Sequence, residues 1–321
     1  LIIALIKITA HMKKSLKIFV KHFVLLLGIA VVALSCSNDE RDSYKTTTLK
    51  FYIEDLEPDA MTSCNYASNV DLGKYDLRLK LWLCKRIKSD YEYSSFEFYS
   101  DSPIINVDKI PREGEYFLFG WADYTMPQGD DLHYVTNMTY DPELYIDMPA
   151  NIVQSEFALN DESYAAYAIS AYIKDGKLMD SDGKLNRVAT KLRIVTEDEE
   201  LAAKVATVEI DHGTIATGLD LHTMNNNLFK DIVQTGEKAS YPNEPRCLAT
   251  TYVMIKNRPQ HHPTERLLSI TLKDENGVVL MHYPEIYVAI DNDLLTTIVL
   301  PNDSRGEVKY YLSAYNYECA Y

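Results

Sequence analysis

The chain has 321 residues and carries 47 acidic against 32 basic side chains, which gives a formal net charge of −15 and a pI of about 5.0. Such acidity argues against a role on nucleic acid, because phosphate binding needs a basic face. With 46% hydrophobic residues the chain can bury a core, and its length predicts one large or two medium domains. Tyrosine is frequent, with 24 tyrosines against 9 phenylalanines, which is typical of half-exposed β-surfaces and contact faces.

The first segment has the pattern of a secretory leader. Met12 is followed within five residues by three lysines, and an apolar run then covers residues 23–34. This run is too short to span a bilayer, which needs about 20 residues, so we predict a signal peptide over residues 1–35. Residues 1–11 precede the methionine and indicate a misplaced start. The alternative is a longer anchor helix over residues 2–35, which five lysines would interrupt.

A cysteine closes the apolar run. Leu34-Ser35-Cys36 resembles the lipobox of bacterial lipoproteins, in which the cysteine thiol is diacylglycerated and the new amine is acylated after cleavage; alanine in place of leucine three positions before Cys36 makes the match partial. Several acyl chains give stable membrane attachment. We therefore expect lipid attachment at Cys36, a polar tether over residues 36–48 and a location on the outer membrane, at the cell surface. The alternative is an ordinary leader cut near Ser35.

The first half of the remaining chain reads as short strands. Over residues 77–83 leucine alternates with Arg78, Lys80 and Trp82, which is the clearest period-two pattern in the chain. Turn signals rich in proline, glycine and aspartate separate this segment from its neighbours. The pattern predicts strands over residues 49–53, 77–83, 96–99, 115–121 and 164–173. Short strands at this spacing favour a sandwich or barrel over a βαβ fold.

Two turn signals, around Gly176 and Gly183, lie close together and predict a domain boundary. We expect an N-terminal β-sandwich over residues 49–176 and a C-terminal β-sandwich over residues 185–321. The second half predicts strands over residues 188–195, 207–210, 267–273, 278–283, 286–290, 295–300 and 308–317. The Asn-Gly pair at residues 276–277 predicts a hairpin turn. One helix is expected, over residues 197–206, because acidic residues open that segment and a lysine lies near its end.

Three segments resemble motifs of the fimbrillin-like surface lipoproteins. Residues 114–124, GEYFLFGWADY, resemble the "G-x-Y…W-A-D-Y" strand of that family. Residues 187–194, RVATKLRI, resemble the strand that opens its second domain, usually "R-P-V-A-K", with proline and alanine replaced here. Residues 292–298, NDLLTTI, resemble its "N-x-L-T-T-I" strand. The alternative for each segment is an ordinary sandwich-core strand.

Together with the lipobox, this resemblance implies an all-β protein with two tandem transthyretin-like (Greek-key) β-sandwich domains. Members of the family include shaft, tip and anchor subunits of fimbriae that assemble by strand exchange. The resemblance therefore implies a non-enzymatic, lipid-anchored accessory or anchor-type fimbrial subunit, acting in assembly or adhesion with fimbrial subunits as partners. Two alternatives stay open. One is a surface lipoprotein that binds glycan or protein without polymerising, and the other is an enzyme whose site the sequence does not reveal.

The resemblance also bears on which end of the chain is exchanged. Shaft subunits of this family expose their groove when a protease removes the first strand after an arginine. Here Arg41 lies only five residues past Cys36, and the next arginine, Arg78, lies inside a predicted strand where a protease has poor access. We expect the N-terminal strand to be retained. The alternating tail over residues 308–317 is then the element that can pair on a sheet edge.

No segment carries a catalytic, metal-binding or cofactor signature. The sequence contains no HExxH, GxSxG, P-loop or dinucleotide fingerprint. His261 and His262 lie between two prolines in a polar segment, which is typical of a solvated loop rather than a metal site. Residues 180–183 hint at a calcium loop, but leucine and alanine stand at two required ligand positions, so a β-turn is predicted. We expect no enzyme activity, metal or cofactor.

Four cysteines follow Cys36, and four cysteines allow three pairings. They are Cys64, Cys84, Cys247 and Cys319. The expected compartment permits disulfides. Pairing the first two together and the last two together keeps each disulfide within one half of the chain, whereas buried thiols are an equal alternative.

Overall fold

The computed structural model describes residues 46–53, 70, 74–87, 90–127, 129, 131–141, 146–241, 244–254, 263–291 and 294–314. Apart from two short helical segments, η3 (Glu162–Tyr164) and α2 (Glu199–Lys204), the elements of this part are strands, which confirms the predicted all-β class. None of its helices is long and apolar enough to cross a membrane.

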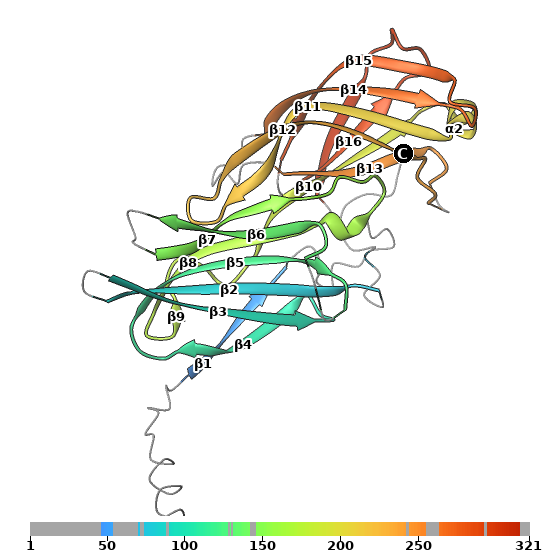
Figure 1. Ribbon diagram of the computed structural model, residues 1–321. Coiled ribbons are helices and arrows are strands. Elements are labelled where there is room, and N and C mark those ends of the chain that lie inside the picture. Colours follow the sequence, from blue (N-terminus) through green and yellow to red (C-terminus); the bar gives the residue numbers. More distant parts are fainter. Residues whose placement is uncertain are drawn as a thin grey trace, which may run out of the picture. The chain divides into compact units, whose positions relative to one another are not determined.

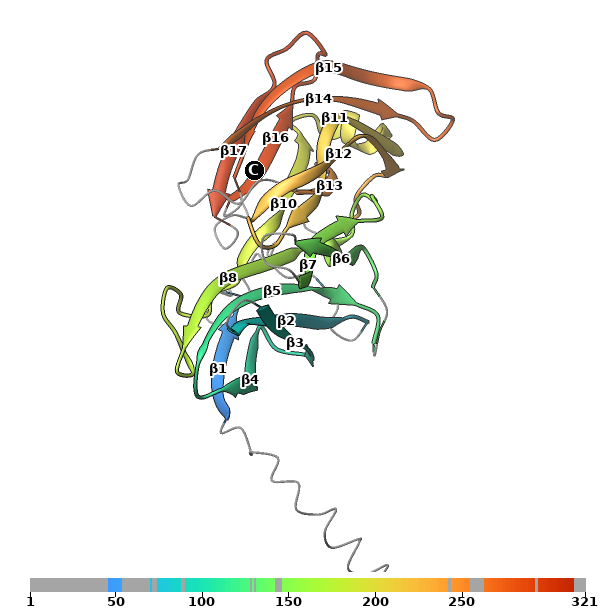
Figure 2. The ribbon, with the colours of Figure 1, turned by 60° about the vertical axis from the view of Figure 1, so that its left-hand side comes forward.

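The strands are named in chain order in Figures 1 and 2. They are β1 (Thr46–Tyr52), β2 (Asp76–Ile87), β3 (Asp90–Ser100), β4 (Ile104–Pro111), β5 (Glu115–Thr125), β6 (Tyr134–Asp141), β7 (Ile146–Gln154), β8 (Ala166–Lys174), β9 (Lys177–Leu178), β10 (Asn186–Thr196), β11 (Thr207–Asp220), β12 (Asn225–Glu237), β13 (Cys247–Met254), β14 (Thr264–Lys273), β15 (Val279–Ile290), β16 (Leu294–Leu300) and β17 (Lys309–Ala314).

Most strands belong to one 15-stranded sheet, and β1 and β4 form a separate two-stranded sheet. The main path of the large sheet runs β15-β14-β11-β13-β10-β8-β5-β2-β3. Four branches leave this path: β12 pairs with β11, β9 pairs with β8, β16 pairs with β10 and carries β17, and β7 pairs with β11 and carries β6. The named strands pair antiparallel except for β10 with β16, which run parallel. Short antiparallel connections explain why so few residues are helical.

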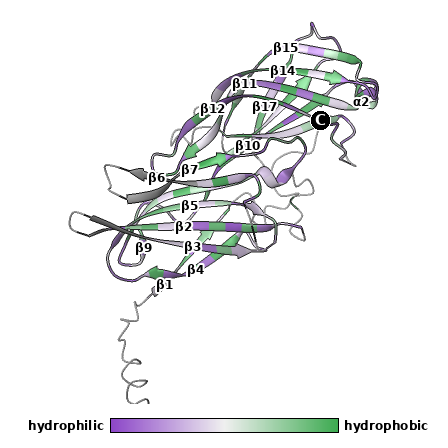
Figure 3. Cartoon of the chain, in the orientation of Figure 1, coloured by the Kyte–Doolittle hydropathy of each residue, from purple (hydrophilic) through white to green (hydrophobic). Residues whose placement is uncertain are grey.

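The first core lies between β2 and the two-stranded sheet. The leucines of β2 at 77, 79, 81 and 83 are at most 2% exposed, and they share one buried cluster with Phe51 of β1, Val107 of β4 and Trp121 of β5. Figure 3 shows the alternation of hydrophobic and hydrophilic residues along β2 that produces this inward face. The strand predicted over residues 77–83 therefore turns its leucines into a core that also contains Trp121, and the two facing sheets form a sandwich.

The second core uses strands that also serve the first. On β10, Val188 and Ala189 belong to the first cluster, whereas Leu192 and Ile194 belong to the second, together with Ile298 of β16. Strands β11 and β13 divide their buried side chains between the two clusters in the same way. The predicted domain boundary falls just before β10, at two turns where Gly176 and Gly183 have positive φ angles. The limits of the two domains remain a prediction.

Several strands carry patterns that the sequence reading missed. Every residue of β13 is buried, so its sequence does not alternate, and β12 is mostly exposed, so no apolar face marks it. Strand β15 is continuous where two strands were expected, because Pro284 lies at an irregularity in its pairing with β14. Since β15 pairs only with β14 among the described strands, its outer edge tolerates a residue that lacks an N–H. The expected helix is shorter, as Asp198 caps α2.

Candidate functional site

The predicted lipid-attachment residue Cys36 lies outside the described residues, as do the leader, most of the tether, Cys64 and Cys319. Cys84 on β2 and Cys247 on β13 are 2% and 1% exposed, and burial raises the pKa of each thiol to about 11. A thiol with such a pKa is a poor nucleophile at neutral pH. Because Cys64 and Cys319, their predicted partners, lie outside the described residues, the two disulfides stay predictions.

His261 and His262 lie outside the described residues. Two of the described histidines, His133 and His212, are buried and contact other side chains. The His133 ring stacks on Tyr164, with 3.6 Å between ring centroids. The Nε2 atom of His212 lies 2.8 Å from Oε1 of Gln234. Burial lowers the pKa of both imidazoles. Within the part of the chain that the structure describes, no three His, Cys, Asp or Glu side chains are grouped so that they could hold a metal ion.

The charged residues of the sequence motifs are buried and paired. Asp123, from the W-A-D-Y segment, is fully buried on β5 and accepts two hydrogen bonds from Arg78 of β2, at 2.9 and 2.7 Å. Lys191 of β10 is also fully buried, and its Nζ lies 2.6 Å from Oε1 of Glu162. The hydroxyl of Tyr252 donates to the other oxygen of Glu162. Removing one member of such a pair leaves the other charge buried without a partner. These residues therefore serve the packing of the sheets rather than the binding of a partner.

The first strand is paired along one edge and is bonded on the other edge at its last residue, Tyr52. On one side β1 pairs antiparallel with β4 from Thr46 to Tyr52. On the other side the backbone N–H of Tyr52 donates to the carbonyl of Gly183 at 3.1 Å, and the N–H of Leu185 donates to the carbonyl of Tyr52 at 2.9 Å. Gly183 has a φ of +95°, and a Cβ atom there would lie 2.1 Å from the carbonyl oxygen of Lys50. We call residues 181–185 the clasp, since this turn fixes the end of β1.

The last described strand is held much less firmly. β17 pairs antiparallel with β16, and among the described strands it has no other partner. Tyr310 and Tyr311 are 41% and 39% exposed, and the side chains of Leu312 and Ser313 are half-buried. The strand expected from the alternating tail is therefore present, and it occupies the edge of its own sheet.

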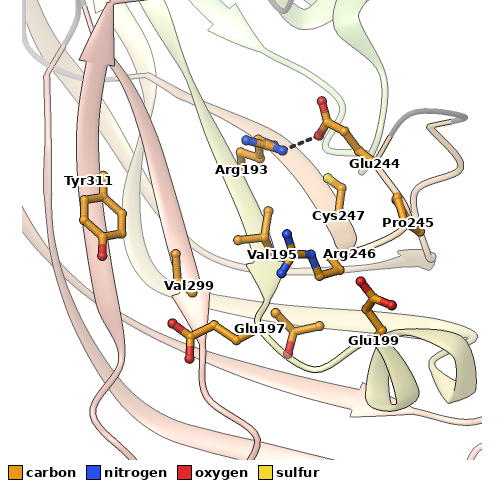
Figure 4. Close-up of a pocket in the computed structure, with 11 residues that line it drawn as sticks. Arg193, Val195, Glu197, Glu199, Glu244, Pro245, Arg246, Cys247, Val299 and Tyr311 are labelled. Atoms are coloured by element: carbon orange, nitrogen blue, oxygen red, sulfur yellow. Dashed lines mark hydrogen bonds and ion pairs between the residues drawn. The ribbon is translucent and has the colours of Figure 1, made fainter. Parts of the chain in front are cut away.

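A pocket of about 290 Å³ opens beside β17 on the sheet face that is turned away from the second core. Its floor is apolar and consists of Val195 of β10, Cys247 of β13 and Val299 of β16. Tyr311 of β17 forms one wall (Figure 4). We call it the Arg246 pocket. Four strands that are far apart in the sequence thus meet at a single hollow, because the parallel pairing of β10 with β16 places their ends together.

The rim of the Arg246 pocket is charged. Arg193 forms an ion pair with Glu244, which is the one contact drawn in Figure 4. Glu197 lies 3.6 Å from Lys309. The Arg246 guanidinium is directed toward Val195 within the pocket, and the described residues provide it with no hydrogen bond or ion pair. A cation without an internal partner beside an apolar floor is suited to an anionic group on a partly apolar ligand.

Comparison with known proteins gives structural neighbours only: no family model and no curated protein matches the chain. Two solved structures of a "putative cell adhesion protein", from Bacteroides ovatus and Parabacteroides distasonis, are each 10% identical, with TM-scores of 0.44 and 0.42. The chain aligns over 84% and 85% of its length with 96% and 97% of theirs. The tip fimbrial protein Mfa3 of Porphyromonas gingivalis, with a C-terminal truncation, is 11% identical over 84% of this chain and 99% of that one, with a TM-score of 0.39.

Proposed function

We propose that the protein is a non-enzymatic, lipid-anchored surface protein of the outer membrane, which acts in adhesion or as an accessory or anchor-type subunit of fimbriae. The lipobox-like segment that ends at Cys36 supports the anchor, and the all-β fold supports assembly through strands. Retention of the first strand would favour an accessory or anchor-type subunit over a shaft subunit, and the pairing of β1 with β4 and its two hydrogen bonds to the clasp support retention.

The observation that carries the assembly role is the light packing of β17. A strand that pairs along one edge and leaves two tyrosines about 40% exposed gives up little apolar burial when it leaves its sheet. Its main-chain hydrogen bonds to β16 can be replaced by those of an equivalent strand from a partner, so the exchange is nearly balanced in free energy. β17 is in this proposal the exchanged element, and β16 offers the edge that a partner strand would occupy.

Deletion of residues 308–321 tests this role. The deleted protein should no longer join a fimbrial subunit in cross-linking experiments or form ladders in non-boiled gels. Circular dichroism should still show the β-sheet spectrum of the intact protein, because among the described residues of the deleted segment only the half-buried Val308 packs against the second core. Tyr310→Ala is the matched control, since it changes an exposed side chain and leaves the main-chain pairing of β17 in place. Undiminished joining by a folded deletion variant would refute exchange at this end.

The anchor is tested separately. Cys36→Ala should leave the protein unprocessed or soluble, because no thiol remains for the diacylglyceryl group. Detergent-phase partitioning reports the outcome. Partitioning that persists in the variant would show that the chain is held at the membrane by something other than lipid on Cys36.

A second candidate function is a surface lipoprotein that binds a glycan without polymerising. The Arg246 pocket favours it, since the hollow combines an apolar floor, a tyrosine wall and an arginine whose guanidinium has no ion-pair partner among the described residues. Saccharide binding by a monomer that never forms ladders would select this function over assembly.

A further inference from the structure

The Arg246 pocket has the size and the chemistry of a site for a single ring. Its volume of about 290 Å³ corresponds to roughly ten water molecules at about 30 Å³ each. The floor of Val195, Cys247 and Val299 belongs to a small buried cluster that lies apart from the two main cores. An apolar floor under a charged rim binds a ligand that has one apolar face and several polar edges.

The charges on the rim restrict the class of ligand. Arg246 offers a planar guanidinium that no described residue occupies, and such a group forms bidentate pairs with a carboxylate or a phosphate. Glu197 and Glu199 lie on the same rim and would repel a ligand with several negative charges, such as a phosphate ester, whereas Glu244 is paired with Arg193. Arg246 disfavours a cation beside it. A ligand with a single carboxylate and further hydrogen-bond donors fits both constraints.

Tyr311 adds the remaining feature. Its ring stands on β17 at the side of the pocket and is 39% exposed, so it offers a flat apolar face to a bound ring. The exposed carboxylate of Glu199 can accept hydrogen bonds from hydroxyl groups. An apolar face, one carboxylate and several hydroxyl groups on a single ring describe a sugar acid.

We propose that the Arg246 pocket binds a hexuronic acid residue of a glycan. Arg246 receives the carboxylate, Tyr311 and the valine floor receive the apolar face of the ring, and Glu199 accepts from its hydroxyl groups. This inference deepens the adhesive form of the proposed function, because it names the class of ligand that the surface protein would hold. It also makes β17 part of the site, so an occupied pocket stabilises this strand on β16.

The test compares D-glucuronate with D-glucose, which differ in the carboxylate, by titration calorimetry or saturation-transfer NMR on the purified protein. We expect glucuronate to bind at least about tenfold more tightly than glucose, as one charge-assisted pair allows. Arg246→Gln should remove this preference. Tyr311→Ala, on β17, should weaken the binding of both sugars. Arg305→Gln is the matched control, because Arg305 is an exposed arginine outside the pocket, and it should bind as the unaltered protein does.

Three outcomes would overturn the proposal: equal affinity for the two sugars, no binding of glucuronate at its highest soluble concentration, or an unchanged preference in Arg246→Gln. Tyr311→Ala and Arg246→Gln change side chains that are not in either main core, and a spectrum identical to that of the unaltered protein verifies their folding. A failure here leaves the joining assay with the 308–321 deletion unaffected, so the pocket and the assembly role can fail independently.

Discussion

The two terminal strands of the described chain both alternate between apolar and polar residues, yet they differ in how firmly the structure holds them. β1 buries Phe51 completely and is bonded on one side by β4 and on the other by the clasp. β17 pairs on one side only and keeps its two tyrosines exposed. Alternation along a strand therefore does not determine how firmly it is held. The difference lies in what covers its second edge and its inner face.

The largest effect should come from truncating the inner face of β1. Phe51→Ala should lower the free energy of unfolding by about 3–5 kcal/mol, because the ring is fully buried in the first core. Tyr310→Ala, at a comparable position on β17, should change it by less than about 0.5 kcal/mol. Urea unfolding followed by circular dichroism measures both. Similar losses in the two variants would show that the strands are equally anchored.

An intermediate effect should follow from opening the clasp. Gly183→Ala should cost about 3 kcal/mol, since the backbone is in a conformation that favours glycine and the added methyl group would meet the carbonyl of Lys50. Gly277→Ala is the matched control. Its φ is +77° but no atom lies within 4 Å of the added carbon, so only the conformational cost of about 1–2 kcal/mol remains. Thermal unfolding measures the loss of stability in each variant. Equal losses would show that the contact with Lys50 adds no steric cost at Gly183.

The smallest effect concerns pH and the second core. Burial lowers the folded-state pKa of His212 below its ordinary value of about 6.5, so the folded protein favours the neutral ring. The contribution to stability is full above that ordinary value and is lost as the pH falls through the lower, folded-state pKa. His212→Gln should make the stability depend less on pH in this window, as judged by urea midpoints in paired buffers. If the urea midpoint of His212→Gln changes with pH as much as that of the unaltered protein, groups other than His212 cause the acid sensitivity.

The sequence predicted what depends on local pattern. The leucine face of β2 and the turn at Asn276-Gly277 follow from alternation and turn chemistry, and both are found in the structure. Strand β13 was missed because it is buried on both faces, which removes the alternation that marks a strand. The pairing of Asp123 with Arg78 was also out of reach, because 45 residues separate them and only the sheet brings them together.

The Arg246 pocket was missed for a related reason. Its residues come from β10, β13, β16 and β17, from α2 and from the turn before β13, and between Arg193 and Tyr311 lie more than a hundred residues. No spacing in the sequence marks such a site, since it exists only once the strands are paired. The one signal in the sequence was a predicted strand with three basic residues, Arg187, Lys191 and Arg193. Buried charges are paired, so this strand indicated acidic partners elsewhere in the chain.

Native-state hydrogen exchange measures the contrast between β1 and β17 directly in the intact protein. The amides of β1 should exchange only through global unfolding, whereas those of β17 should exchange through a local opening of much lower free energy. The 308–321 deletion should leave the protection of β1 unchanged. Equal protection in β1 and β17, or an opening of β1 before β17, would contradict the assignment of β17 as the exchanged strand.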